Sequence, residues 1–316
     1  MNAIAATATV QTVTHDLLTG TEWSAAQIRE LYHLTADIKA RPERYRSALA
    51  GRFLAMIFEK PSLRTRVTFE VGIASMGGGA IFLDHTQSRL GERESVRDVA
   101  KNLDRWVQGI VARVFEQKVL DELAENASIP VINALSDWFH PCQALADFFT
   151  LEERFGTLRG VKLAYIGDGN NVCHSLLTIG ARVGAHVRVA TPAGYEPNAE
   201  VVAEARRAAR ETRGKIEILR NPEEAVDGAQ GIYTDVWASM GQENEAAKRE
   251  TIFAAYQVNE TLFAQADPRA VFMHCLPAHR GAEVTCNVID GEQSIVFEQS
   301  ENRLHVQKAI LLTLLG

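Results

Sequence analysis

The sequence predicts an α/β protein with two domains, each a mostly parallel sheet with helices on both faces, joined by interdomain helices. Three observations lead to this fold class. The chain has 316 residues, which suits two domains of about 150 residues each. Short apolar, β-branched runs alternate with longer segments of helical period. These runs are continuous rather than alternating, which is typical of parallel strands covered on both faces.

In the first half, a helix is expected to begin after Ser24, because Gln27 three residues later completes a capping box. A second helix is expected over about 64–76, and the glycines at 77–79 mark its exit. The apolar runs predict strands at Phe53–Phe58, Ala80–Leu83, Ile110–Phe115 and Val131–Ala134.

The second half repeats this rhythm. Its runs predict strands at Lys162–Ile166, His186–Ala190, Lys215–Leu219, Gly231–Val236 and Val271–His274. Segment 141–155 is expected to be a helix that bridges the domains, and the last helix, 302–316, is expected to return to the first domain. The expected first domain is therefore 1–138 with 302–316, and the second is 139–301.

Composition narrows the classes of function. Hydrophobic residues make up 46% and charged residues 23%, as in globular proteins, and no apolar run reaches the roughly 20 residues of a membrane span. A net charge of -7 argues against a general binder of nucleic acid or anionic membranes. No basic residue precedes the first apolar stretch, and the four cysteines lack paired spacing. A cytoplasmic location is expected.

The strongest site signal is segment 58–66, which leaves a buried strand and enters a helix. Unpaired N–H groups and the positive helix end would point at one spot there. Ser62 and Thr65 add hydroxyl groups, and Arg64 adds a fork suited to phosphate oxygens. An ordinary N-cap followed by surface arginines is the alternative. Two arginines in a first turn, where cations oppose the helix dipole, favour an anion site.

Two further segments carry candidate donors. Pro141 fits the first position of a helix, which places His140 and Gln143 near its N-terminus. His140 could donate to a carbonyl oxygen, or it could simply cap the helix. Arg113 lies inside the run Ile110–Phe115, where an arginine must either enter a cleft or form a structural ion pair.

Three strand ends of the second half supply the remaining candidates. The glycine turn at 165–171 lacks the third glycine of a dinucleotide site, so it is expected to present Asn171 at the sheet edge. Asp235 could pair with a cationic amine or cap a helix. Cys275 and the backbone carbonyl of Leu276 would face the same edge, although a lone cysteine there is commonly a core residue.

Together these motifs resemble the aspartate/ornithine carbamoyltransferase family over nearly the whole chain. Segment 62–66 is similar to the family's Ser-Thr-Arg-Thr-Arg phosphate motif, with Leu63 at a position that serves through its backbone. Segment 140–143 matches the family's His-Pro-x-Gln motif. Asp235 with Ser239-Met240-Gly241, and the His-Cys-Leu-Pro of 274–277, are similar to the ornithine-using branch. An aspartate-using relative would show His-Pro-Leu-Pro and lack the Ser-Met-Gly loop.

The resemblance implies a role for each matching position. Carbamoyl phosphate would be held by Ser62, Leu63, Arg64, Thr65, Arg113, His140, Gln143, Cys275, Leu276 and Arg303. Ornithine would be held by Asn171, Asp235, Ser239 and Met240, and the catalytic residues would be Cys275, Arg113 and His140. One departure is that Arg89 stands where the family places a glutamine that reaches a neighbouring subunit, while Gln87 lies two residues earlier. Which of the two reaches the phosphate is left open.

The implied reaction is carbamoyl transfer from carbamoyl phosphate to the δ-amine of L-ornithine, giving citrulline and phosphate, in arginine metabolism. No metal or organic cofactor is expected, and the resemblance implies a homotrimer or a multiple of it. The alternative acceptors are N-acetylornithine, putrescine and aspartate. A catalytically silent metabolite sensor is disfavoured by the complete phosphate motif, and an NAD-dependent dehydrogenase by the incomplete glycine fingerprint.

Overall fold

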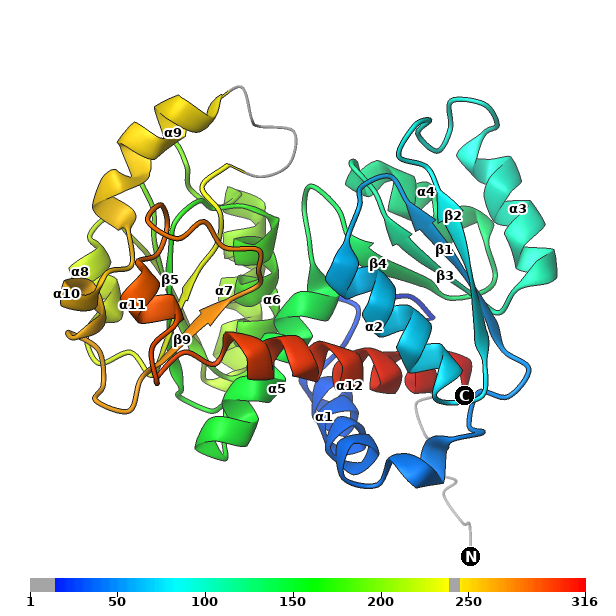
Figure 1. The fold of residues 1–316 in the computed structure, drawn as a ribbon, viewed down its shortest axis with the longest axis horizontal. Helices are drawn as coiled ribbons and strands as arrows, with labels where there is room; N and C mark the ends of the chain where they lie inside the picture. Colours follow the sequence, from blue (N-terminus) through cyan, green and yellow to red (C-terminus); the bar gives the residue numbers. More distant parts are fainter. Residues whose placement is uncertain (1–14, 239–244) are drawn as a thin grey trace, which may run out of the picture.

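The computed structural model describes residues 15–238 and 245–316 of the chain. Figure 1 shows two lobes side by side, one built from the first half of the chain and one from the second. The long helix α12 (Val296–Leu315) passes from the second lobe to the first. Among the described residues, none of the helices is both long and apolar enough to span a membrane. The predicted α/β fold class with two parallel-sheet domains is confirmed.

The first lobe holds a four-stranded parallel sheet in the order β2-β1-β3-β4. The strands are β1 (Phe53–Phe58), β2 (Gly79–Asp84), β3 (Gly109–Arg113) and β4 (Val131–Leu135). The helices of this half are α1 (Ala25–Ala40), η1 (Pro42–Tyr45), α2 (Leu63–Ala74), α3 (Val96–Trp106) and α4 (Gln117–Asn126). α2, α3 and α4 each connect two parallel strands, as parallel pairing requires.

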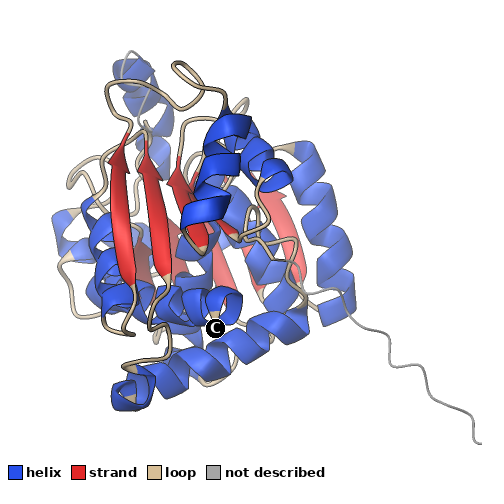
Figure 2. Cartoon of the chain, turned by 90° about the vertical axis from the view of Figure 1, so that its right-hand side faces the viewer, coloured by secondary structure: helices blue, strands red, loops and turns tan. Residues whose placement is uncertain are grey.

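The second lobe holds a five-stranded parallel sheet in the order β7-β6-β5-β8-β9. Its strands are β5 (Lys162–Ile166), β6 (His186–Ala190), β7 (Lys215–Leu219), β8 (Gly231–Thr234) and β9 (Val271–His274). Its helices are α6 (Asn171–Val183), α7 (Ala199–Thr212), α8 (Pro222–Val226), α9 (Ala246–Phe253), η3 (Ala254–Tyr256), α10 (Glu260–Phe263) and α11 (Cys286–Ile289). The view in Figure 2 shows helices on both sides of the strands.

Two helices join the lobes. α5 (Pro141–Phe155) has the predicted bounds, with Pro141 in its first turn and Gly156 in the left-handed conformation after its end. α12 packs against α1, α2 and α5, and the largest apolar core runs continuously from one lobe to the other through these helices. The carboxyl edges of the two sheets, where the strands end, contribute residues to one cavity between the lobes.

Several element boundaries differ from the prediction. β3 ends at Arg113 and β8 at Thr234, each two residues earlier than expected, because the chain leaves the sheet there to form the loops of the cavity described below. α12 begins at Val296 rather than at residue 302. Asn302 is not a cap but a buried mid-helix residue, whose amide donates to Thr150 and Glu153 of α5. The predicted capping box between Ser24 and Gln27 is present.

Candidate active site

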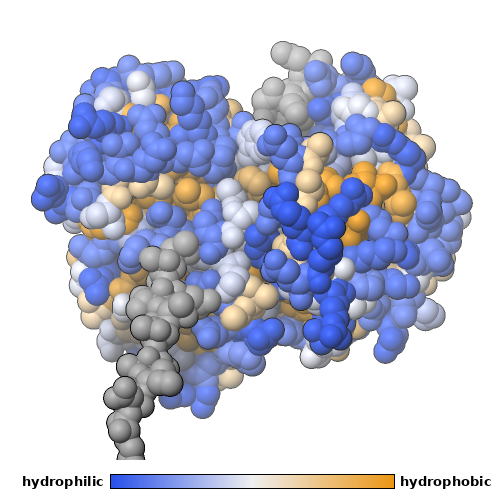
Figure 3. Space-filling model, turned by 180° about the vertical axis from the view of Figure 1, so that it is seen from behind, coloured by the Kyte–Doolittle hydropathy of each residue, from blue (hydrophilic) through white to orange (hydrophobic). Residues whose placement is uncertain are grey.

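A cavity of about 890 Å³ lies between the lobes, at the carboxyl ends of strands from both sheets. The described residues that the sequence predicted for the site all line it. They are Ser62, Leu63, Arg64, Thr65, Arg113, His140, Gln143, Asn171, Asp235, Cys275, Leu276 and Arg303. Ser239 and Met240 lie outside the described residues. The face of the protein in Figure 3 is mostly hydrophilic, with smaller hydrophobic areas on both lobes.

The N-terminus of α2 forms one wall of the cavity. Ser62 is its N-cap, and the Ser62 hydroxyl accepts from the Thr65 N–H at 3.3 Å. The Leu63 side chain is 75% exposed, so this residue offers the cavity its backbone rather than a polar side chain. Arg64 lines the cavity, but Arg66 does not: Arg66 pairs with Glu70. Of the two arginines in this turn, only Arg64 therefore lies where the sequence predicts an anion site.

Three arginines from different elements meet beside this wall. Arg64 lies in the first turn of α2, Arg113 ends β3 and Arg303 lies in α12. The register of β3 against β4 shifts between Ala112 and Arg113, an irregularity of the kind that re-aims a side chain next to a site. Within the described ranges, none of the three arginines forms an ion pair with a carboxylate. The structural ion pair considered for Arg113 is therefore absent from the described residues, and the three cations favour an anionic ligand.

Mutual repulsion and burial act on these groups. Burial and the neighbouring Arg303 lower the pKa of Arg113 to about 10, which leaves it charged at pH 7. Burial and the same arginines hold the pKa of His140 well below its usual value, so His140 is a neutral imidazole at pH 7. The His140 side chain does not cap α5, and its Nδ1 has no hydrogen-bond partner among the described residues. A buried nitrogen of this kind is available to a ligand.

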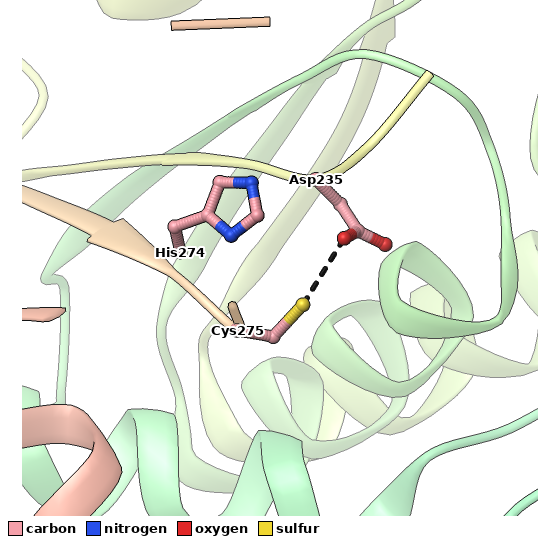
Figure 4. Close-up of side chains that lie close together, drawn as sticks. All are labelled: Asp235, His274 and Cys275. Carbon is pink, nitrogen blue, oxygen red and sulfur yellow. Dashed lines mark hydrogen bonds between the residues drawn. The ribbon is translucent and has the colours of Figure 1, made fainter. Parts of the chain in front are cut away.

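The opposite wall carries an acidic group paired with a thiol. Cys275 follows β9, and its Sγ donates to Asp235 Oδ1 at 3.0 Å (Figure 4). The other oxygen, Asp235 Oδ2, accepts from Asn170 Nδ2 at 2.8 Å. Burial and Asp235 raise the pKa of Cys275 well above its usual value. Cys275 is therefore a protonated thiol at neutral pH, and not a free thiolate.

His274 holds the loop that carries Cys275. Its Nδ1 accepts from the Leu276 N–H at 2.9 Å, and its Nε2 lies 3.2 Å from Glu283 Oε1. Leu276 has a φ of 56°, a conformation that a β-carbon disfavours and that the His274 contact stabilises. Asp235, His274 and Cys275 are close enough together to ligate a metal ion. Because both His274 nitrogens face partners inside the protein, only Asp235 and Cys275 offer ligand atoms there.

The glycine turn after β5 is a packing feature. A β-carbon at Gly169 would lie 2.1 Å from the Pro197 nitrogen, so the two chain segments can approach only with glycine there. Asn170 is the N-cap of α6, and the Asn171 side chain donates to the Ser136 carbonyl at 2.6 Å. Asn171 thus reaches across to the loop after β4 while it lines the cavity.

Sequence reasoning missed an ion pair on the cavity wall. Arg249 of α9 lies 2.7 Å from Asp168 Oδ2, donates to the Trp237 carbonyl at 2.9 Å, and lies over the Tyr195 ring. Both charged side chains are at most 10% exposed. The local pattern of 245–253 offers only an i,i+4 pair of Glu245 with Arg249, because the buried partner Asp168 stands 81 positions earlier. Asp168 and Asn170 both lie in the glycine turn after β5. The signal that could have identified Asp168 is a carboxylate at the end of a strand.

Replacing Arg249 by methionine is expected to destabilise the protein by about 3 kcal/mol, because it leaves the Asp168 carboxylate buried without its partner. Denaturant unfolding followed by circular dichroism measures this change. Arg280→Met is the control: Arg280 pairs with Asp290 at the surface, and its loss should leave the unfolding midpoint nearly unchanged. An equal effect of the two substitutions would contradict the assigned role of the buried pair.

The loop after β2 carries Arg89 and Gln87, the two residues at the departure from the family motif. The Arg89 guanidinium lies 4.1 Å from the centre of the Phe115 ring and 3.9 Å from Glu116. Gln87 is exposed. Neither residue lines the cavity of its own chain.

Comparison with known proteins agrees with these features. Two sequence profiles match: "Aspartate/ornithine carbamoyltransferase, carbamoyl-P binding domain" over residues 15–153, and "Aspartate/ornithine carbamoyltransferase, Asp/Orn binding domain" over 159–314. An ornithine carbamoyltransferase of Anoxybacillus flavithermus is 51% identical, over 98% of this chain and 99% of its own length. The solved ornithine carbamoyltransferase of Pyrococcus furiosus is 50% identical with a TM-score of 0.92, covering 95% of this chain and 97% of that one. That of Thermus thermophilus is 47% identical with a TM-score of 0.87, covering 96% and 100%.

Proposed function

Because the chain belongs to the aspartate/ornithine carbamoyltransferase family, we propose that it transfers the carbamoyl group of carbamoyl phosphate to the δ-amine of L-ornithine, releasing citrulline and phosphate. The observation that carries this proposal is the division of the cavity. One wall gathers arginines beside a helix N-terminus, and these form no ion pair with a carboxylate in the described part of the chain; the other wall offers a carboxylate bonded to a thiol. A phosphorylated electrophile suits the first wall, and a cationic amine suits the second.

Carbamoyl phosphate is assigned to the first wall. The backbone of 62–65, the Ser62 and Thr65 hydroxyls and Arg64 take the phosphate, while Arg113, His140, Gln143 and Arg303 take the carbamoyl end. Support comes from the α2 N-terminus and from the cations that have no carboxylate partner among the described residues. His140, as a neutral imidazole, can donate one hydrogen bond to the carbamoyl oxygen.

Ornithine is assigned to the second wall. Asp235 and Asn171 orient its amino-acid end, together with Ser239 and Met240, and the Leu276 carbonyl and Cys275 lie near the reacting amine. The sequence features that favour ornithine over aspartate are Cys275 within His-Cys-Leu-Pro and the Ser-Met-Gly segment.

The chemical step needs a free amine. An ornithine δ-amine resembles lysine, with a pKa near ~10.4, so only about one molecule in 2,500 is neutral at pH 7. The nitrogen lone pair attacks the carbamoyl carbon, and the resulting oxyanion is stabilised by Thr65, Arg113 and His140. Cys275 acts as a relay: its thiol hydrogen passes to Asp235 as the sulfur takes the amine proton. The C–O bond to phosphate then breaks, and phosphate leaves with the electron pair toward Arg64.

Cys275→Ser is expected to lower kcat about tenfold, because a hydroxyl relays a proton less readily than a thiol. The rate of the variant should still rise between pH 6 and 9, because the titrating group is the ornithine amine. Cys275 does not contribute to the rise in the unaltered protein, since its raised pKa keeps the thiol protonated over this range. Initial rates across this range measure both effects. A flat pH–rate profile in the unaltered protein would contradict the requirement for a free amine.

The proposed function is tested by mixing the purified protein with carbamoyl phosphate and ornithine, N-acetylornithine, putrescine or aspartate in turn. Citrulline formed from ornithine, with little product from the other three, is the expected result. Turnover with a different amine would overturn the acceptor assignment and leave the carbamoyl-phosphate assignment standing. An absence of product with all four would overturn the enzymatic function.

We also propose a homotrimer. Support comes from a stripe of apolar side chains on the outer face of α2, where Leu63, Val67 and Val71 are 45–75% exposed. The stripe begins next to the phosphate wall, so a neighbouring subunit bound there would lie close to the site. Light scattering should give three times the 34.8 kDa of one chain, or a multiple of that.

Domain assignment and location are proposed from the same features. The carbamoyl-phosphate domain comprises 1–138 with the C-terminal helix, since α12 packs on α1 and α2, and the ornithine domain comprises the segment between them. The four cysteines are free thiols, which suits a reducing cytoplasm.

A further inference from the structure

A row of buried polar groups runs beside the cavity from the first lobe toward the second. At its first end, Arg303 donates through Nη2 to Thr65 Oγ1 at 3.0 Å and through Nη1 to Gln143 Oε1 at 2.8 Å. Gln143 donates through Nε2 to Asp147 Oδ1 at 2.8 Å. Thr65 and Gln143 belong to the wall assigned to carbamoyl phosphate, so this end of the row is anchored to that half-site.

The other end of the row reaches the acceptor wall. Gln299 of α12 donates through Nε2 to the same oxygen, Asp147 Oδ1, at 2.6 Å. Gln299 Oε1 accepts from the main-chain N–H of His274 at 3.0 Å, directly before Cys275. Asp147 is fully buried and Gln299 is 1% exposed, and neither lines the cavity. Asp147 and Gln299 therefore lie behind both half-sites, and neither touches a substrate.

The hydrogen bonds converge on one atom. Donors point toward Asp147 Oδ1 from Gln143 on one side and from Gln299 on the other. A reversed carboxamide at Gln143 would turn its NH₂ toward the Arg303 donor and its oxygen toward the carboxyl group. A reversed Gln299 would face its NH₂ toward the His274 N–H. The Asp147 oxygen thus fixes the orientation of both carboxamides, and it accepts whether or not the other oxygen carries a proton.

Burial makes this arrangement cooperative. A buried donor or acceptor that loses its partner has no water to replace it, so displacing one member of the row is costly unless the next member follows. Carbamoyl phosphate bound to Arg303 and Gln143 would hold these two side chains in place, and this would restrict the Asp147 side chain. Through Gln299, this restriction reaches the end of β9, where Cys275 meets the acceptor.

We propose that Asp147 and Gln299 are positioning residues that couple the two half-sites, so that a ligand on the carbamoyl-phosphate wall strengthens binding of the amino-acid acceptor. The identity of the two ligands rests on the proposed function. Coupling of this kind is a ratio of affinities, with typical factors of about 5 to 150. It is therefore measured by binding and does not depend on turnover.

The experiment uses two unreactive probes. Phosphonoacetamide replaces the bridging oxygen of carbamoyl phosphate by carbon, and L-norvaline is ornithine without its δ-amine. Calorimetric titration gives the Kd of norvaline with and without saturating phosphonoacetamide. In the unaltered protein, the phosphonate should tighten norvaline binding by a factor of about 10 or more. Gln299→Met and Asp147→Leu should lower this factor below about 3, while norvaline alone binds with nearly unchanged Kd.

Two further variants separate coupling from general loosening. Asp147→Asn keeps an acceptor oxygen in place and should retain most of the factor. Asn302→Leu removes a different buried contact between α12 and α5, to Thr150 and Glu153, and should retain the full factor. If Asp147→Leu fails to fold, Gln299→Met still gives the answer.

Three results would overturn the proposal: no coupling in the unaltered protein, an unchanged factor in Gln299→Met, or an equal loss of coupling in Asn302→Leu. Citrulline formation by the unaltered protein tests the proposed function separately. A protein that makes citrulline yet shows one of these three results would keep its function and lose this assignment.

Discussion

Arg113→Met should lower kcat for citrulline formation by a factor of 100 or more. Arg113 is aimed into the cavity by the register shift of β3, and it keeps its charge because its pKa, lowered to about 10, still lies far above neutrality. A donor placed at a developing oxyanion is typically worth about 3–4 kcal/mol, which corresponds to a loss of a hundredfold or more. Methionine keeps much of the side-chain volume, so the fold should persist. Steady-state kinetics with both substrates saturating measures the effect.

The matched control for this prediction is Arg188→Met. Arg188 also lies in a parallel strand, but it pairs with Glu217 and does not line the cavity. Its loss should leave kcat within about twofold, since it contacts neither reacting group. A kcat for Arg113→Met within threefold of the unaltered protein would remove the oxyanion role assigned to Arg113.

Asp235→Asn is expected to lower kcat/KM for ornithine at least a hundredfold. One carboxylate oxygen accepts the Cys275 thiol and the other accepts the Asn170 amide. An asparagine has a single acceptor oxygen, so its NH₂ group must face one of these two donors. The substitution also removes the negative charge that we propose binds the cationic amine. In addition, it removes the carboxylate that we propose takes the relayed proton. These losses act together on the same step.

This second prediction is specific because Asp235→Asn should affect ornithine and carbamoyl phosphate differently. The KM for carbamoyl phosphate should change less than about threefold, because its wall is built from other residues. Asp267→Asn, at a partly exposed carboxylate that pairs with Arg269 and does not line the cavity, should leave both constants unchanged. Equal losses for the two substrates in Asp235→Asn would indicate a general disturbance of the cavity and would contradict the assignment.

The sequence was most informative where function and local pattern coincide. β1, β5, β6, β7 and β9 have the predicted bounds, because each is a short segment rich in apolar and β-branched residues with clear ends. The site residues that directly follow strands or begin helices were predicted for the same reason: parallel strands bring their carboxyl ends to one edge. Arg113, Asp235 and Cys275 line the same cavity although they are far apart in the chain.

Contacts made only by tertiary packing could not be predicted. Gln299 meets Asp147 across 152 positions, and Arg249 meets Asp168 across 81. Neither residue stands in a motif, and both occur in helices whose polar residues look like ordinary surface positions. The predicted start of α12, at residue 302, was wrong for a related reason. The polar segment 298–302 looks like a loop ending in a cap, but in the fold Gln299 and Asn302 are buried against α5 and its neighbours.

The path of α12 has a consequence for synthesis of the protein. A nascent chain that has emerged as far as residue 295 contains every strand of both sheets, yet it lacks the helix that packs on α1 and α2. Val306, Ile310 and Leu311 bring apolar surface to that junction only after both sheets have been translated. The junction between the lobes therefore reaches its native packing last, although α1 and α2 leave the ribosome early, and contacts between distant parts of the chain decide when folding finishes.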